Sequence, residues 1–150
     1  IYSGMQIYGV SINKNFDPIY SFIEQSQIVS FTNITTTKEL FADIKSTDKI
    51  TMVDLYADWC VACKELDKYT FNEKKVSVLL QNLNLIKLDI TKTNDDNSKF
   101  LKDYKLFGPT AILFFNNDGE EIRNARIVGF IDADDFIQVY QNINMRISLK

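Results

Sequence analysis

The two cysteines of the chain, Cys60 and Cys63, are the residues whose type and spacing point most directly to chemistry. They stand in the segment Trp-Cys-Val-Ala-Cys-Lys, between an apolar run and a helix-compatible run that begins at Lys64. A strand that ends before the first cysteine and continues into a helix places that sulfur at a helix N-terminus, where the helix dipole favours a thiolate. The second sulfur follows one turn later, within reach of a disulfide. The spacing therefore indicates a redox-active pair.

Thiol:disulfide exchange needs one thiolate that attacks a disulfide and a second thiol that resolves the mixed disulfide. We expect Cys60, nearer the helix start and the solvent, to be the nucleophile and Cys63 to be the more buried resolving partner. The alternative is a structural disulfide or two reduced core cysteines. A bridge that closes so short a loop removes little unfolded-state entropy, and packing does not explain the flanking Trp59 and Lys64. Both observations favour the redox interpretation.

Composition excludes several other classes of function. Histidine is absent, which removes Ser-His-Asp and Cys-His catalysis and any metal site that needs imidazole. The 20 acidic and 17 basic residues give a net charge of −3 without a basic block, so nucleic acid is not an expected partner. Two cysteines supply only half of a four-thiolate metal site. We expect no metal and no organic cofactor, with the Cys60–Cys63 disulfide as the redox group.

The chain contains no apolar run near the roughly 20 residues that a membrane-spanning helix needs. It begins at Ile1 without an initiator Met or a recognisable signal peptide, so we interpret it as a piece of a longer protein. Its 150 residues suit one domain with additional length. We assign residues 1–27 to an N-terminal extension or linker, with one short helix at 19–25, and residues 28–150 to the domain.

Alternating strands and helices predict an α/β fold with a mixed sheet between helical layers. Capping residues predict where helices begin: Thr36 or Thr37, Asn72, Thr93 or Asn94, and Asp132. The Asn-Asn-Asp-Gly sequence at 116–119 predicts a hairpin. The expected strands are 28–34, 50–57, 85–90, 111–115 and a return strand to 128–129; the expected helices are 38–46, 60–69, 72–83, 93–104 and 132–143.

Several of these residues together carry a family resemblance. Asp54, the Trp-Cys-x-x-Cys-Lys segment and the Pro109-Thr110 pair before an apolar strand resemble the thioredoxin superfamily. The longer run 54–64, followed by Tyr-Thr-Phe at 69–71, is similar to the C-terminal periplasmic domain of the DsbD family, bacterial membrane thiol:disulfide interchange proteins. Phe31-Thr32, the run 112–115 and Gly129-Phe130 extend the likeness, which covers about residues 28–142. The resemblance implies a thioredoxin fold with helices on both faces of the sheet.

In that family the C-terminal domain takes electrons from a cysteine pair in the transmembrane domain of the same protein. It passes them to the N-terminal periplasmic domain of that protein, which in turn reduces other periplasmic thiol:disulfide proteins. The resemblance thus implies a protein-disulfide reductase domain, monomeric in isolation, at the periplasmic face of the inner membrane, with residues 1–27 as a tether. One alternative is a membrane-tethered thioredoxin for cytochrome c maturation, which Val61-Ala62 and the 69–71 segment disfavour. Another is a thioredoxin-like module that binds peptides without turnover.

Two acids are candidates for moving protons, Asp54 by the resemblance and Asp67 by its spacing from Cys60. In the superfamily a buried carboxylate at the place of Asp54 lies beneath the cysteine pair and moves protons; the alternative is a tolerated polar core residue. Asp67 falls two helical turns beyond Cys60 and is a second candidate, although helix surfaces commonly carry acids. Nearby carboxylates oppose the helix dipole. We therefore expect Cys60 to be less acidic than a typical thioredoxin nucleophile.

Residues around the loop that faces the cysteines complete the expected site. The resemblance implies a cis Gly108–Pro109 bond that presents backbone to a partner's extended segment; an ordinary loop proline is the alternative. Gly108 departs from relatives that carry proline or leucine before the cis-proline. Trp59 is expected to shape the rim of the site. Tyr56 and Phe107 either line the same surface or pack in the core.

Overall fold

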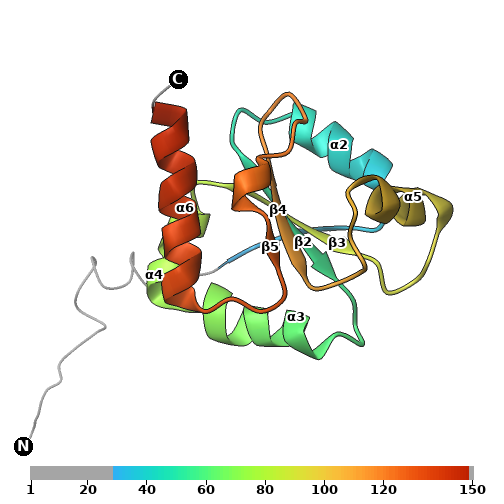
Figure 1. Ribbon diagram of the computed structural model, residues 1–150, viewed down its shortest axis with the longest axis horizontal. Coiled ribbons are helices and arrows are strands. Elements are labelled where there is room, and N and C mark those ends of the chain that lie inside the picture. The colour runs from blue at the N-terminus through green and yellow to red at the C-terminus, as the bar shows by residue number, and fades with distance from the viewer. Residues whose placement is uncertain (1–28, 149–150) are drawn as a thin grey trace, which may run out of the picture.

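The structure, a computed structural model, describes residues 29–148 and is built on one five-stranded sheet with the order β1-β3-β2-β4-β5 (Figure 1). The predicted boundary after residue 27 and the predicted short helix at 19–25 lie outside the described residues. The strands are β1 (Thr32–Ile34), β2 (Thr51–Tyr56), β3 (Asn84–Asp89), β4 (Ala111–Phe115) and β5 (Ile127–Val128). The helical segments are α2 (Thr37–Lys45), α3 (Val61–Glu65), η2 (Leu66–Phe71), α4 (Lys74–Leu80), α5 (Asp95–Asp103), η3 (Arg123–Ala125) and α6 (Ala133–Ser148).

The central strand β2 has neighbours on both sides, which explains its nearly continuous apolar sequence. It pairs in parallel with β3 and antiparallel with β4. Alternate residues point to opposite faces of a strand, so Met52 packs in one core cluster while Val53 and Leu55 pack in the other. By the same alternation, Asp54 shares the face of Met52.

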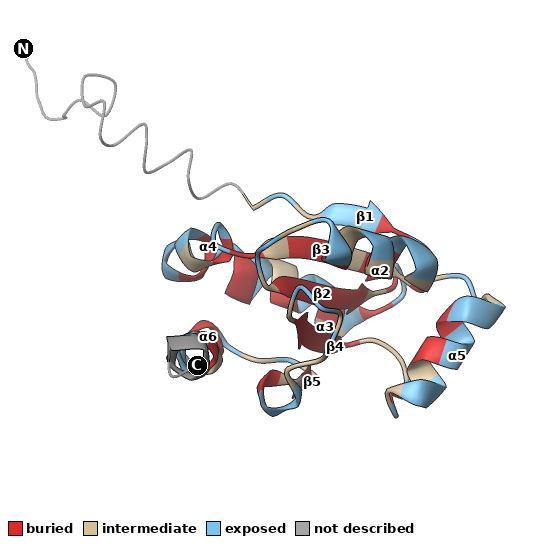
Figure 2. Ribbon diagram, turned by 90° about the horizontal axis from the view of Figure 1, so that it is seen from above, coloured by how far each residue is buried: buried red, intermediate tan, exposed pale blue. Residues whose placement is uncertain are grey.

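Helices cover both faces of this sheet, as the sequence predicted. Helices α2 and α5 pack on one face, where Leu40, Ile44 and Phe100 join the cluster of Val53 and Leu55. The segments η2, α4 and α6 cover the other face, which contains Met52. Figure 1 shows these two groups on opposite sides of the strands, and Figure 2 shows buried residues concentrated in β2, β3 and β4. The prediction of a mixed sheet between helical layers is confirmed.

Most predicted helix starts are confirmed by side-chain caps. The side chains of Thr36, Asn94 and Asp132 accept hydrogen bonds from backbone N–H groups three residues later. The prediction for Asn72 is wrong, because α4 begins after Glu73 and Asn72 instead ends η2. The predicted helix 60–69 starts correctly, but it changes after Glu65 into the π-helical segment η2. Such segments are frequent at functional sites.

The predicted hairpin is correct at its turn and wrong along most of its return strand. Asn116 organises the turn, since its Oδ1 accepts hydrogen bonds at 3.0 Å from the backbone N–H groups of Asp118 and Glu120. A single bridge then joins Phe115 to Glu121 before η3 interrupts the pairing. Only Ile127–Val128 return to the sheet as β5. Within residues 29–148 no helix has the length and apolar character that crossing a membrane requires.

Candidate active site

The cysteine pair lies where β2 ends and α3 begins, as the sequence predicted. Cys60 and Cys63 form a disulfide with their Cα atoms 5.3 Å apart. Cys60 is the N-cap of α3, and its Sγ accepts a hydrogen bond from the Cys63 backbone N–H at 3.1 Å. Cys63 is fully buried, whereas Cys60 retains 7% exposure. The first sulfur therefore lies nearer the solvent and at the positive end of the helix.

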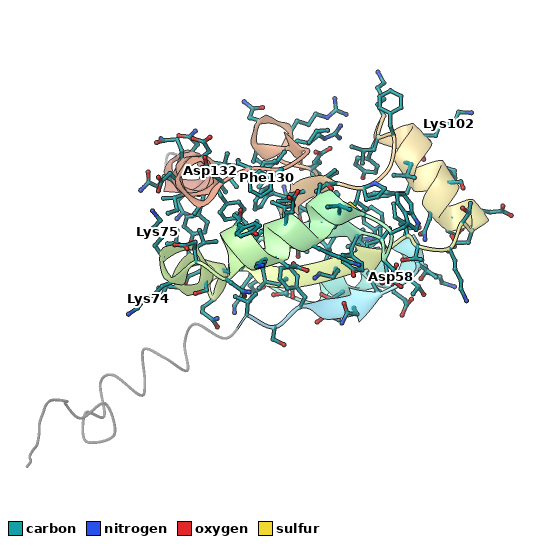
Figure 3. All side chains as sticks on the ribbon, turned by 90° about the horizontal axis from the view of Figure 1, so that it is seen from below. Asp58, Lys74, Lys75, Lys102, Phe130 and Asp132 are labelled. Carbon is teal, nitrogen blue, oxygen red and sulfur yellow. A yellow bond between two sulfur atoms is a disulfide. The ribbon has the colours of Figure 1, made fainter. Side chains whose placement is uncertain are left out.

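The loop before Cys60 is fixed by hydrogen bonds that end β2 in a tight turn. The Cys60 N–H donates to the Ala57 carbonyl at 3.0 Å, and the Asp58 N–H donates to the Thr91 hydroxyl at 2.9 Å. The intervening Trp59 is 65% exposed and thus lies at the surface beside the disulfide. In the view of Figure 3, the labelled Asp58 and Phe130 lie on opposite sides of α3.

Asp54 is fully buried in the sheet face beneath α3 and η2. Neither of its carboxylate oxygens has a hydrogen-bond partner among the described residues. Burial raises the pKa of Asp54 from 3.8 to about 7; Lys87 opposes this shift and the nearby Asp67 adds to it. The carbonyl of the next residue, Leu55, is 3.6 Å from Cys63 Sγ. Asp54 is therefore a buried acid with a pKa near neutral, in the residue next to the one whose carbonyl approaches the buried sulfur.

Lys87 connects the two acids that the sequence singled out. It lies opposite Asp54 on the neighbouring strand β3, with its Nζ 4.0 Å from Asp54 Oδ2. The same Nζ is 2.9 Å from Asp67 Oδ2, and it lies about 5 Å from the centroids of the Phe31 and Tyr56 rings. A half-exposed carboxylate, a buried carboxylate and one cation thus form a compact charged group under the helix that carries the cysteines.

The prediction of a cis Gly108–Pro109 peptide bond is wrong. The cis peptide bond lies between Pro109 and Thr110, one residue later than expected, and the Gly108–Pro109 bond is trans. Thr110, rather than the proline, meets the disulfide: its Oγ1 is 3.0 Å from Cys60 Sγ and 3.3 Å from Cys63 Sγ. Gly108 has φ +143 and open space where a side chain would project. Gly108 and Pro109 therefore belong to the loop that leads to Thr110, the residue that contacts the two sulfurs.

Apolar side chains are exposed around the disulfide. Phe107 is fully exposed, which excludes the core-packing alternative for it, and Val61 and Val128 are each more than two-thirds exposed. Tyr56 is half-buried and packs against the buried cluster formed by Ala57, Cys60 and Cys63. A hollow of about 210 Å³, lined by residues 105–111 and Val128, opens beside Thr110. The loop before Thr110 and the start of α3 therefore carry exposed apolar side chains.

Sequence reasoning missed Lys87 and Thr110. A basic residue between Ile86 and Leu88 in a buried strand was the available signal for Lys87, because a parallel neighbour would bring it opposite Asp54. The Pro109-Thr110 pair marked the loop that faces the cysteines, but it did not predict that the Thr110 side chain meets the sulfurs, because that depends on how the loop after α5 enters β4.

The fold and the site define a class of protein. A disulfide at a helix N-terminus, after the central strand of a mixed sheet covered by helices, is the arrangement of thioredoxin-like thiol:disulfide oxidoreductases. The sequence profile of the thioredoxin-like domain family matches residues 37–144.

Comparison with known proteins places the chain in one group within this class. The C-terminal domain of DsbD from Neisseria meningitidis, in its oxidised form, superposes with a TM-score of 0.64 and 30% identity over 75% of this chain and 98% of that one. The thiol:disulfide interchange protein DsbD of Yersinia pestis is 49% identical over 94 residues, and that of Haemophilus influenzae is 40% identical over 109. The chain spans only 16% and 19% of those two proteins. The chain belongs to the thioredoxin-like family, in the group of DsbD C-terminal domains, and it is a thiol:disulfide oxidoreductase.

Proposed function

We propose that this domain relays two electrons between protein thiols, from a membrane-embedded cysteine pair of the same protein to a periplasmic partner domain. The observation that carries the proposal is the disulfide itself, with Cys60 at the helix N-terminus and Cys63 buried behind it. The DsbD relatives are five to six times longer than the matched part, which leaves room for both partner domains. Their likeness also supports a location at the periplasmic face of the bacterial inner membrane.

The relay step follows from the unequal burial of the two sulfurs. In the reduced domain the Cys60 thiolate attacks a partner disulfide, so that a Cys60–partner bond forms and the partner's own S–S bond breaks. Cys63 then loses its proton and attacks Cys60, which forms the Cys60–Cys63 disulfide and releases the partner as a dithiol. Two electrons pass to the partner. A donor dithiol returns the domain to its reduced state by the reverse sequence.

We propose that Asp54 receives the Cys63 proton during resolution and returns it when the domain is reduced. Its pKa of about 7 allows both protonation states at neutral pH, which a free carboxylate would not. Lys87 orients this exchange by holding positive charge 4.0 Å from Asp54 while pairing with Asp67. Trp59, Gly108 and Pro109 are proposed to contact the partner, because they lie at the edge of the same site.

The relay is tested by mixing the reduced chain with the oxidised N-terminal periplasmic domain of a DsbD relative, then quenching with a thiol-alkylating reagent and measuring masses. The unaltered chain should become oxidised while the partner gains two alkylated thiols. Cys60→Ser should transfer no electrons. Equal transfer by Cys60→Ser, or no transfer by the unaltered chain, contradicts the proposal. A module that only binds peptides would be indifferent to this substitution.

A further inference from the structure

Thr110 places a hydroxyl group against both sulfurs of the active site. Its Oγ1 lies 3.0 Å from Cys60 Sγ and 3.3 Å from Cys63 Sγ, and the residue is only 7% exposed. It stands directly before β4, the antiparallel neighbour of β2, and therefore reaches the cysteines from the side opposite to α3. Water has little access to this contact. The hydroxyl is thus part of the immediate surroundings of the reacting atoms.

We propose that the Thr110 hydroxyl is a catalytic group of the exchange reaction, which donates its hydrogen bond to whichever of the two sulfurs carries negative charge. This inference rests on the proposed electron relay and adds to it a residue that contacts the reacting sulfurs. A hydroxyl has one donor hydrogen and two acceptor lone pairs, and it rotates to suit its neighbours. One group can therefore serve both sulfurs in turn.

In the disulfide, neither sulfur carries a hydrogen, so the hydroxyl must be the donor, and its single hydrogen is shared between the two sulfurs or points to one of them. In the reduced domain, Cys60 thiolate has two donors at hand, the Cys63 N–H at 3.1 Å and the Thr110 hydroxyl at 3.0 Å. The Cys63 thiol can meanwhile donate to the same hydroxyl oxygen. The hydroxyl then connects the two groups, with Cys63 as donor and Cys60 as acceptor, and stabilises the reactive thiolate.

The same hydroxyl acts when electrons enter the domain. A donor thiolate attacks Cys60 Sγ, the donor–Cys60 bond forms, the Cys60–Cys63 bond breaks, and Cys63 leaves with the electron pair. Rotation of the hydroxyl toward Cys63, 3.3 Å away, stabilises that leaving thiolate until it takes up a proton. In the opposite direction the same bond stabilises the Cys63 thiolate that resolves a mixed disulfide. Both directions of the relay therefore use one donor.

An uncharged donor is suited to this place because the acids beneath the helix work against a thiolate. Asp54 of β2 and Asp67 of η2 are acids, and Lys87 of β3 is engaged with both. Near pH 7 the ionised form of Asp54 disfavours a second negative charge close by. Thr110 approaches from β4 and supplies stabilisation that does not change with pH.

The test compares Thr110→Val, which removes the hydroxyl at nearly constant shape, with Thr110→Ser, which keeps it. Thr51→Val is the matched control, because Thr51 is a fully buried hydroxyl at the other end of β2. Two rates are measured on folded protein. The first is alkylation of Cys60 by iodoacetamide across pH in the reduced chain. The second is release of thionitrobenzoate when Cys63 attacks the mixed disulfide between Cys60 and thionitrobenzoate. Thermal unfolding of each oxidised variant checks folding, and Thr110→Ala replaces the valine variant if valine prevents folding.

Loss of a hydrogen bond to an ionised group should slow both reactions about tenfold at neutral pH in Thr110→Val. The alkylation profile should also move to higher pH. Thr110→Ser and Thr51→Val should stay within about threefold of the unaltered chain. Unchanged rates in Thr110→Val, or equal slowing by valine and serine, overturn the role of the hydroxyl. The relay itself is judged separately, because its failure would show as absence of electron transfer in the unaltered chain.

Discussion

Replacing Asp54 by Asn should stabilise the oxidised domain, and the gain should grow with pH. Asp54 is buried without a hydrogen-bond partner among the described residues, and its nearest cation, Lys87 Nζ, is 4.0 Å away. Ionising such a group in the fold is costly because water no longer solvates the charge. Asparagine keeps the shape and removes the charge. The substitution therefore isolates the cost of the carboxylate.

The size of the effect follows from the two pKa values. In the unfolded chain Asp54 should titrate near its ordinary value of 3.8, and in the fold its pKa is about 7. Between these values the folded state binds the proton more tightly, so the unfolded state ionises first and the free energy of unfolding falls as pH rises. The shift between the two pKa values corresponds to a loss of about 4 kcal/mol in the free energy of unfolding. It is absent below about pH 4, fully developed above about pH 7, and constant beyond.

Denaturant unfolding of the oxidised protein at pH 4, 5.5, 7 and 8 measures this directly. Asp54→Asn should match the unaltered chain at the lowest pH and exceed it by several kcal/mol at the highest, with about 4 kcal/mol as the upper end. Asp67→Asn is the control, because its half-exposed carboxylate is paired with Lys87 at 2.9 Å and should give no comparable gain. A variant that is less stable than the unaltered chain at pH 8, or a difference that is constant with pH, would refute the reasoning.

Three further substitutions test two ion pairs and the exposed ring of Phe107. Arg126→Met leaves the Glu121 side chain, only 3% exposed, without its cation, and should cost about 3 kcal/mol in denaturant unfolding. Lys99→Met, which breaks an exposed ion pair, should cost less than about 1 kcal/mol; equal losses would contradict the assignment. Phe107→Ser should leave stability within about 0.5 kcal/mol, because the ring is fully exposed, yet slow exchange with a partner domain severalfold. Slowing of reaction with a small disulfide to the same extent would argue against a partner surface.

Local patterns in the sequence were sufficient for much of the fold. Strand β2 and the caps at Thr36, Asn94 and Asp132 depend on neighbouring residues alone, and all were predicted. The return strand after the 116–119 turn was not, because η3 interrupts the pairing and Arg126 turns to Glu121 and to the Tyr104 carbonyl. The contact with Tyr104 joins residues 22 apart in the chain, and the pairing of Arg126 with Glu121 forms only once η3 has turned the chain, so no local periodicity predicts either of them.

For the site, too, the residues with local sequence signals were predicted and those that depend on the folded arrangement were not. The cysteine pair and Asp54 were recognised because a helix start and a buried acid leave local signals. Thr110 was missed and Pro109 misplaced, since a one-residue difference in how the loop enters β4 decides which side chain meets the sulfurs. Lys87 depends on strand register, which places it opposite Asp54 only once the sheet is formed.

The central claim, that Cys60 attacks and Cys63 resolves, is tested most directly by trapping. Cys63→Ala should accumulate a mixed disulfide with an oxidised periplasmic partner domain, and mass spectrometry of the linked peptides should place it on Cys60. The unaltered chain should show little of it, because Cys63 resolves the intermediate, and Cys60→Ala should show none. An equal yield from Cys60→Ala, linked through Cys63, or no adduct from Cys63→Ala, would contradict the account.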